Sequence, residues 1–248
     1  MPERTVHSIV LRRRDVGETD RRLTILTEES GKMDVVAKGA RKAASRLAGI
    51  SDPLTVARLS IAEGKHTAFI TQAQPMSSFR GLRMDFERLS LALALVELYA
   101  AVCPYEQPFP EAFELLQVSL AQLEHHERPL VAMVWAQVRL LQETGFFPQL
   151  DRCIVSDEPL TEGDPFLSPH AGGYVSDFAA VSYTDRYRVR AEILYGLDKM
   201  VPLDEPPKQF KAAEESLLAL FPFWRHVAET PLPANDAYLA EIRHSRIV

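Results

Sequence analysis

The sequence predicts an α+β protein of several domains, in which an N-terminal β-barrel precedes a helical part. In the first eighty residues, short runs of alternating apolar and polar residues stand between tight turns. After Pro75, apolar residues recur at the spacing of helices. The charge changes at the same place, because residues 1–80 carry 14 Lys and Arg against 9 Asp and Glu, whereas residues 81–248 carry 14 against 25. We therefore expect one domain over residues 1–80 and a second over residues 81–248.

Five strands are expected in the first domain, over residues 5–14, 21–30, 32–39, 53–64 and 66–75. Leu23 and Ile25 alternate with polar residues in the second of them, as in a half-buried strand. Gly31 and Gly64 lie in the turns, where glycine can take a positive φ. Short strands with tight turns favour a small closed barrel, because closure removes the exposed sheet edges. The five-stranded barrel that fits this count is the OB-fold.

Six helices are expected in the second domain, over residues 82–104, 110–127, 128–148, 184–200, 206–224 and 234–245. The first is apolar at almost every turn, which is typical of a buried central helix. Pro110 and Pro129 suit the first turn of a helix, and Gly145 suits a helix end. Dispersed Asp, Gly, Pro and Ser between the third and fourth helices predict an irregular insert at about residues 149–182.

The composition indicates an ordinary globular protein of the cytoplasm. Its 248 residues carry a net charge of -6. The sequence contains no run of about twenty apolar residues, so we expect no transmembrane helix and no membrane partner. The N-terminus lacks the apolar segment of a secretory signal. The two cysteines, Cys103 and Cys153, do not suggest a disulfide framework.

Positive charge is concentrated in two segments of the first domain. Five arginines fall within residues 12–22, which we expect between the first and second strands, and residues 38–46 add four cations after the third strand. Loops of this kind can line one side of a barrel and follow a phosphate backbone, because they neutralise charge and release counterions. The expected DNA-binding residues are Arg12, Arg13, Arg14, Arg21, Arg22, Lys38, Arg41, Lys42 and Arg46.

Two other interpretations of these basic segments stay open. Asp15, Glu18 and Asp20 interrupt the arginines, so the segments could instead form a solvated surface of salt bridges. The same cations could also bind an acidic partner protein without touching DNA, which would make the chain a protein-only adaptor.

Aromatic residues are sparse in the first domain, where Phe69 and Phe79 are the only ones. A surface that stacks on the bases of single-stranded DNA usually holds more aromatic rings. We expect Phe69 to lie in the barrel core. Contacts to the DNA backbone should therefore dominate, with a strong dependence on salt.

The sequence lacks the motifs of familiar catalytic sites. Gly31-Lys32 has no glycine five residues before Gly31, which a phosphate-binding loop requires. His125 and His126 are adjacent, which is not the spacing found in zinc proteases. We expect no catalytic residue, no cofactor and no enzyme activity. A hydrolase that uses scattered carboxylates is the remaining alternative, without support from any spacing.

The spacing of residues in the insert is similar to that of a zinc knuckle, with a cysteine and a turn followed about twenty residues later by a Gly-Gly hairpin. A four-cysteine site needs thiolates at positions i and i+3 of each half. The four positions here read Cys153, Ser156, Ser176 and Ala179. His170, Asp151 or Asp177 could in principle substitute, but we expect a loop without metal. The residues expected to hold that loop together are Phe166, Tyr174 and Phe178.

The N-terminal pattern resembles the bacterial RecO family of DNA repair proteins, which are recombination mediators. Its most specific features are Glu18-x-Asp20, SGK at residues 30–32 and KGARK at residues 38–42. QETGFFPQLDRC, residues 142–153, is similar to the family's passage from a long helix into its zinc knuckle. The resemblance covers most of the chain and weakens after about residue 185. It implies an OB-fold domain, a helical domain and a zinc-knuckle-like insert, although this chain departs from the family's usual cysteine pattern.

The resemblance also implies a function. Proteins like RecO bind single- and double-stranded DNA, anneal complementary strands, and engage the acidic C-terminal tail of single-stranded DNA-binding protein (SSB). With RecR they help to load the RecA recombinase onto SSB-coated DNA, and they are not enzymes. The implied location is the bacterial cytoplasm, at the nucleoid. Arg128 and Arg139 flank or lie on the apolar helix 129–143 and are candidate cations for the acidic tail, although they could simply solvate that helix.

Overall fold

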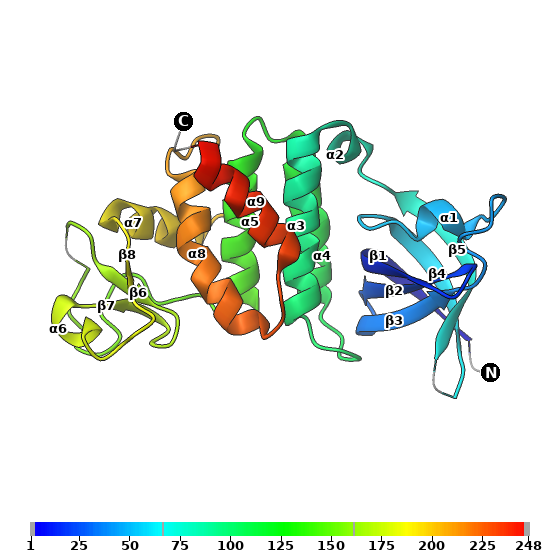
Figure 1. Cartoon of the computed structure of the whole chain (residues 1–248), viewed down its shortest axis with the longest axis horizontal. Coiled ribbons are helices and arrows are strands. Elements are labelled where there is room, and N and C mark those ends of the chain that lie inside the picture. The colour runs from blue at the N-terminus through cyan, green and yellow to red at the C-terminus, as the bar shows by residue number, and fades with distance from the viewer. Residues whose placement is uncertain (1–2, 66, 161, 246–248) are drawn as a thin grey trace. The chain divides into compact units, whose positions relative to one another are not determined.

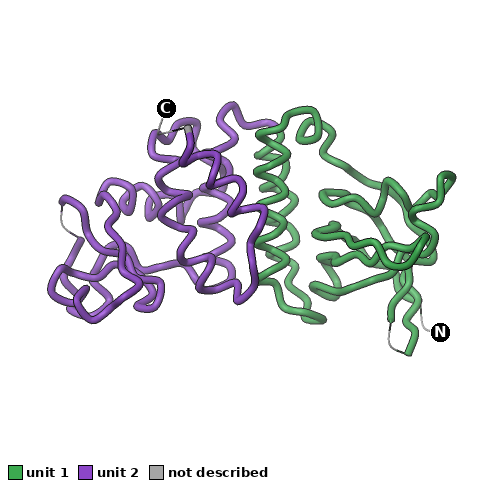
Figure 2. The backbone as a smooth tube through the Cα atoms, in the orientation of Figure 1, with its two compact units in different colours: residues 1–124 green, residues 125–248 purple. Residues whose placement is uncertain are grey.

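The computed structural model describes residues 3–65, 67–160 and 162–245. Its backbone forms two compact units, residues 1–124 and residues 125–248 (Figure 2). The expected domain boundary at residue 80 falls inside the first unit, because three helices group with the barrel. The functional division at residue 80 stays a prediction. Within the described residues, no helix is long and apolar enough to cross a lipid bilayer.

The first unit begins with a closed barrel of five strands, which confirms the expected OB-fold (Figure 1). The strands are β1 (Glu3–Val16), β2 (Asp20–Thr27), β3 (Gly31–Ala37), β4 (Val56–Glu63) and β5 (Ala68–Ser77). They close in the order β1-β2-β3-β5-β4, and only the β3–β5 pair is parallel. Residue 66, the first residue of the predicted fifth strand, lies outside the described residues.

Alternate residues of the strands fill the barrel, because side chains of a strand point to opposite faces in turn. Leu23 and Ile25 of β2 and Met33 and Val35 of β3 belong to this buried core. Burial of each large apolar side chain contributes about 1.5–3 kcal/mol to folding. The residues between them, such as Thr24, must therefore face the outside of the barrel wall.

The first hairpin differs from the prediction in one respect that matters for charge. Arg12, Arg13 and Arg14 lie within β1, and Arg21 and Arg22 lie within β2. The expected strands 5–14 and 21–30 already contained these arginines, so only the description of residues 12–22 as a connection between the strands is wrong. A β-bulge shifts the register of β1 between Val10 and Arg12, and beyond it the hairpin is paired up to Val16 and Asp20.

A short helix, α1 (Leu47–Ile50), follows β3 and was not predicted. Its four residues are too few for apolar periodicity to reveal. Ile50 belongs to the barrel core and Leu47 packs against it. The basic loop after β3 therefore has a firm point of attachment at its far end.

Three helices complete the first unit, namely α2 (Arg80–Met84), α3 (Phe86–Val102) and α4 (Pro110–His125). The single helix predicted from residue 82 to 104 is two helices, because Asp85 has an extended backbone. The Asp85 carboxylate accepts the N–H of Arg88 at 3.1 Å and so caps α3. As expected from its composition, α3 is buried on most sides.

The second unit contains α5 (Pro129–Glu143), α7 (Ala191–Met200), α8 (Ala213–Ala228) and α9 (Pro233–Ser245). Trp224 of α8 donates its indole N–H to the Gln137 side-chain oxygen of α5 at 2.8 Å, deep in the core. Gly145 has φ +75 just after α5, which confirms the predicted helix end. α8 begins later than predicted and continues beyond Pro222.

The insert is more regular than predicted. Its second half and the residues just after it form a three-stranded sheet of order β7-β6-β8 with a short helix. These elements are β6 (Phe166–Ser168), β7 (Gly173–Val175), α6 (Asp177–Ala180) and β8 (Tyr187–Arg188). The prediction of a helix at the position of β8 is wrong. Tyr187 pairs with Leu167 of β6 and belongs to a strand. Strands this short carry too little alternation to be read from sequence.

Candidate nucleic-acid interface

The bulge in β1 distributes the arginines of the first hairpin between two sides of the barrel wall. Beyond the bulge, the cross-strand pairs are Arg12 with Thr24, Arg13 with Leu23, Arg14 with Arg22, and Asp15 with Arg21. Residues that face each other across two strands share a side of the sheet. Leu23 is a core residue, so Arg13 lies on the inner side near the barrel end, whereas Arg12 and Arg14 lie on the outer side.

Four of the predicted cations form one outer surface, which we call the basic face: Arg12, Arg14, Arg22 and Lys38. Arg12 and Arg14 are exposed and have no carboxylate partner in the described part of the chain. Arg22 Nε lies 3.5 Å from Asp34 Oδ2, which is the one ion pair of this face among the residues that the structure describes, and Lys38 acts on Asp20 at longer range. The positive charge of the basic face is therefore available to an outside anion.

Three other predicted cations form ion pairs. Arg13 pairs with Asp52, and Arg21 lies 3.4 Å from Asp15 and 3.6 Å from Asp52. Arg41 Nε lies 3.3 Å from Asp15. Most of these groups are partly exposed, so each pair contributes little to stability. The interpretation as a surface of salt bridges therefore applies to Arg13, Arg21 and Arg41, because nearby carboxylates largely neutralise their charge.

Asp20 holds the loop that follows β3. Its carboxylate accepts the N–H of Gly39 at 2.8 Å and the hydroxyl of Thr19 at 2.9 Å. The Gly39 N–H, followed by the Thr19 hydroxyl, lowers the pKa of this carboxyl, so it stays ionised. Lys42 and Arg46 of the same loop are exposed, and neither forms an ion pair in the described residues, while the charges of Lys38 and Lys42 help to lower the pKa of Asp20. The hairpin and the loop, which are separate in sequence, are thus brought together.

Two aromatic rings lie on the outer side of the barrel, and the sequence predicted neither there. Phe69 pairs with Val36 of β3, is half-buried, and carries Lys38 Nζ at 4.0 Å from its ring centre. The prediction that Phe69 lies in the core is therefore wrong, because its neighbours Ala68 and Ile70 take the inward positions. Tyr105, from the connection between α3 and α4, lies beside Lys32 of β3.

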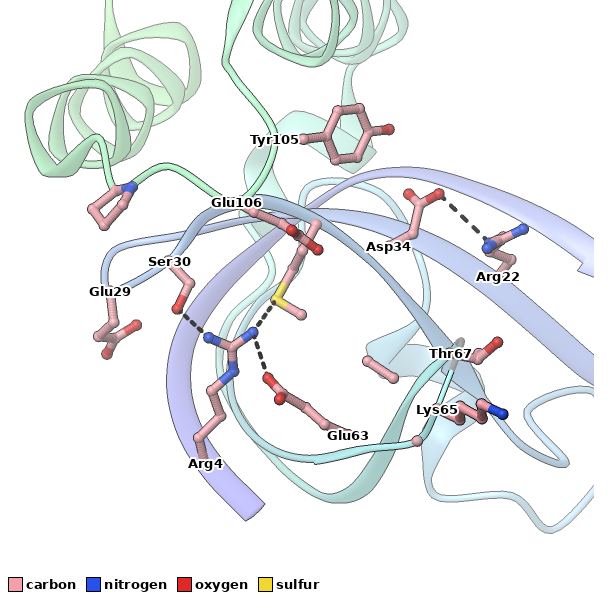
Figure 3. A pocket seen from close by; sticks show the side chains of 14 residues that line it. Arg4, Arg22, Glu29, Ser30, Asp34, Glu63, Lys65, Thr67, Tyr105 and Glu106 are labelled. Carbon is pink, nitrogen blue, oxygen red and sulfur yellow. Dashed lines mark hydrogen bonds and ion pairs between the residues drawn. The ribbon is translucent and has the colours of Figure 1, made fainter. Parts of the chain in front are cut away.

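A cavity of about 770 Å³ opens next to this surface (Figure 3). Arg22 and Asp34 lie on one side of it, and Tyr105 stands near them. Arg4 crosses the other side, bonded to Ser30 at 2.8 Å and paired with Glu63 at 3.0 Å. The charged lining residues are Arg4, Arg22, Glu29, Asp34, Glu63, Lys65 and Glu106. The lining of the cavity contains four acidic and three basic side chains. A phosphate group should therefore bind to the basic face in preference to the cavity.

One cluster of metal-ligand types occurs in the described residues, on the barrel surface. His7 Nδ1 lies 3.2 Å from Glu28 and 3.0 Å from Glu29. Glu29 also accepts the backbone N–H of His7 at 3.0 Å. The hydrogen bonds and ion pairs between His7, Glu28 and Glu29 therefore account for the proximity of these side chains without a metal ion.

The four knuckle positions do not fit a zinc ion. Cys153 is buried, and its sulfur accepts the N–H of Ser156 at 3.4 Å and the N–H of Ser176 at 3.2 Å. Burial raises the pKa of this thiol, but the hydrogen bonds of Ser156, Ser176 and Val155 together outweigh burial and lower it to about 7. Serine hydroxyls are poor zinc ligands and Ala179 offers none. Of the substitutes considered, Asp177 lies 3.5 Å from Arg188.

The two arginines considered for an acidic tail differ in their surroundings. Arg139 donates to the Leu203 carbonyl at 2.8 Å and lies 3.6 Å from Glu143 and 3.7 Å from Asp204. It therefore ties α5 to the segment after α7. Arg128 is exposed at the start of α5.

A closed five-stranded barrel with an outer basic face, followed by a set of helices, defines an OB-fold protein with an added helical region. Two family models match the chain, Recombination protein O N terminal over residues 1–79 and Recombination protein O C terminal over residues 83–223. The chain belongs to the RecO family.

Curated relatives agree with this assignment. The DNA repair protein RecO of Heliobacterium modesticaldum is 39% identical over 174 residues, which are 68% of this chain and 63% of the relative. That of Roseiflexus sp. is 37% identical over 166 residues, 67% of this chain and 58% of the relative. That of Bacillus subtilis is 34% identical over 146 residues, 59% of this chain and 57% of the relative. The chain thus spans less than two thirds of the length of each of these relatives.

Proposed function

We propose that this chain acts in DNA repair and homologous recombination as a mediator that binds single- and double-stranded DNA. In this role it anneals complementary strands and, together with RecR, helps to load RecA onto SSB-coated DNA. Membership of the RecO family and the names of its relatives support a place in DNA repair. The role is not catalytic, and its place is the bacterial cytoplasm, at the nucleoid.

The observation that carries this proposal is the basic face on an OB-fold barrel. Arg12 and Arg14 are exposed and unpaired within the described residues, and Arg22 and Lys38 stand beside them. Guanidinium and ammonium groups on this face contact phosphates, so they bind DNA without reading its sequence. Neutralised phosphates repel one another less, which lets two complementary strands meet. Residues 1–80 form the DNA-binding domain in this proposal, and residues 81–248 provide contacts to proteins.

The acidic tail of SSB requires a cation next to apolar surface. Arg128 is the better candidate, because its side chain is exposed, whereas Arg139 already bonds the Leu203 carbonyl. A carboxylate of the tail would pair with Arg128 at the start of α5.

The proposal is tested by replacing Arg12 and Arg14 with Gln in one variant. We expect affinity for single- and double-stranded oligonucleotides of any sequence to fall roughly tenfold at moderate salt. For single strands, the slope of log affinity against log salt should become about 1.4 units shallower, since each lost phosphate contact contributes about 0.7. Fluorescence anisotropy with labelled oligonucleotides at several salt concentrations measures both quantities.

A matched control replaces Arg152 and Arg225 with Gln. These two arginines lie in the second unit and pair with Asp157 and Asp236, and the variant has the same change in net charge. Its affinity and salt slope should stay near those of the original protein. If the original protein binds no DNA even at low salt, the proposal fails, and the alternative of a protein-only adaptor takes its place.

A further inference from the structure

Side chains on the outer wall of the barrel form a regular grid next to the basic face. One row runs from Arg12 through Thr24 to Asp34, and the next runs from Arg14 through Arg22 to Val36. Thr24 donates its hydroxyl to Asp34 at 2.7 Å, which connects the strands within the first row. Lys32 precedes Asp34 by one repeat of the strand, so it occupies the same side of β3.

Tyr105 extends this grid beyond β3. The Lys32 N–H donates to the Pro104 carbonyl at 3.3 Å, and the Glu106 N–H donates to the Lys32 carbonyl at 2.9 Å. These bonds attach the connection between α3 and α4 to the edge of β3 as a short parallel bridge. Residues paired in this way present their side chains on the same side of the sheet. The Tyr105 ring therefore stands on the outer wall, two strands away from Arg22.

Lys32 packs against one face of the Tyr105 ring and fixes its position. Lys32 is buried, and its ammonium donates to the Ala100 carbonyl at 2.7 Å and lies 4.3 Å from the centre of the Tyr105 ring. Burial lowers the pKa of Lys32, and the charge of Arg12 lowers it further, while Cys103 and Asp34 act in the opposite direction. The ring itself remains 56% exposed. An exposed ring with one face supported is ready to accept a flat partner on the other.

We infer that Tyr105 is a base-stacking residue, and that the basic face together with Tyr105 binds unpaired nucleotides in preference to duplex DNA. This inference rests on the proposed function. Phosphates of a single strand contact Arg12, Arg14 and Arg22, while one base turns toward Tyr105 at the mouth of the neighbouring cavity (Figure 3). Arg22 pairs with Val36, and Tyr105 pairs with Lys32, four residues earlier on β3. Two strand spacings of about 4.8 Å across the sheet and about 13 Å along it place the ring roughly 16 Å from Arg22, a distance that a few nucleotides of a single strand span.

Duplex DNA cannot use this ring in the same way. Each base in a duplex is already stacked and paired, and turning it outward costs a few kcal/mol. The phosphate contacts of the basic face, by contrast, are open to either form of DNA. Tyr105 should therefore add affinity for single strands alone and leave the salt slope unchanged, because stacking releases no counterions.

The test compares Tyr105→Leu with Tyr105→Phe and with Phe178→Leu, all in the full chain. Phe178 is the control, because it is an exposed aromatic residue of α6 that does not belong to the basic face. We expect Tyr105→Leu to lose roughly tenfold in affinity for a single-stranded oligonucleotide. Its affinity for the duplex of the same sequence and its salt slope should not change. Tyr105→Phe and Phe178→Leu should bind single strands like the original protein.

The outcomes separate this inference from the proposed function. If the original protein binds DNA and Tyr105→Leu binds single strands equally well, the stacking role is refuted while the mediator role stands. Equal losses for single strands and duplex in Tyr105→Leu would also refute it, since they point to a disturbed barrel edge. Failure of the original protein to bind either form of DNA would overturn both.

Discussion

At the scale of single residues, arginines that are neighbours in sequence have different environments. Arg12 and Arg14 extend into solvent from the outer wall, whereas Arg13, between them, pairs with Asp52. The difference follows from strand geometry, because successive side chains point to opposite sides. The same positive charge is therefore available for phosphate at one position and neutralised at the next.

Cys153 shows how one residue can stabilise a turn without a metal ion. Its sulfur accepts two backbone N–H groups that close the knuckle around it. These bonds favour the thiolate, and together they lower the pKa of the thiol from 9.0 to about 7 against the opposing effect of burial. The other cysteine, Cys103, is different, because burial raises its pKa to about 12.

We therefore predict that Cys153 makes the stability of the protein depend on pH. The folded pKa lies below the unfolded value, so the thiolate stabilises the fold fully above about pH 9 and loses this effect as the pH falls through about 7. The difference in the free energy of unfolding between the original protein and Cys153→Ser should grow by the order of 2 kcal/mol from about pH 6 to about pH 9. Urea denaturation at several pH values measures it. Cys103→Ala should leave this pH dependence intact, and a pH-independent difference would contradict the prediction.

At the scale of elements, the connection between α3 and α4 is attached to the barrel through a glycine. Gly31 has φ +69, and a Cβ atom there would lie 1.8 Å from the Gln107 carbonyl oxygen. No side chain fits in that space, so the close approach of the two backbones depends on glycine. The same approach holds Tyr105 beside β3, which links a turn residue of the barrel to the proposed stacking site.

We predict that Gly31→Ala destabilises the protein by roughly 2–4 kcal/mol, because strain at positive φ adds to displacement of the connection. Gly17→Ala is the control, since Gly17 also has a positive φ, +58, but a Cβ atom there would meet no other atom within 4 Å. The control should lose only about 1 kcal/mol. Chemical denaturation compares the two variants. Equal losses would mean that backbone strain alone matters and that the connection packs loosely on Gly31.

At the scale of the whole molecule, charge is divided between the parts of the chain. Residues 1–80 carry an excess of five positive charges, whereas residues 81–248 carry an excess of eleven negative charges. An acidic region repels DNA at long range, so nucleic acid should be directed to the barrel. Within the barrel, the ion pairs of Asp15 and Asp52 reduce the number of cations that remain available.

This division predicts the salt dependence of the intact protein. Four cations on the basic face give a slope of log affinity against log salt of about -3 for single-stranded DNA, and Lys42 and Arg46 extend it to about -4. All nine predicted residues together would give about -6. Binding measured over a range of salt concentrations should therefore yield a slope between about -3 and -4. A slope near -6 would show that DNA displaces Asp15 and Asp52 from their arginines.

The amino-acid sequence by itself determined the five strands, the main helices and the concentration of positive charge, because apolar periodicity, turn residues and charge are local properties. Its motifs also led to the correct family. It did not reveal the short elements α1 and β8, whose few residues carry too little pattern. The sequence also could not show which basic residues are neutralised, since the Asp52 carboxylate that pairs with Arg13 and Arg21 lies outside the two strands that carry them.

Only the tertiary structure decided which arginines face outward and which ring stands beside them. One extra residue in β1 exchanges the inner and outer sides of a strand, because the side-chain period is two. Tyr105 reaches the basic face through backbone hydrogen bonds to Lys32, far away in sequence. Pairing between distant segments depends on the packing of the whole barrel, and no local pattern of residues encodes it.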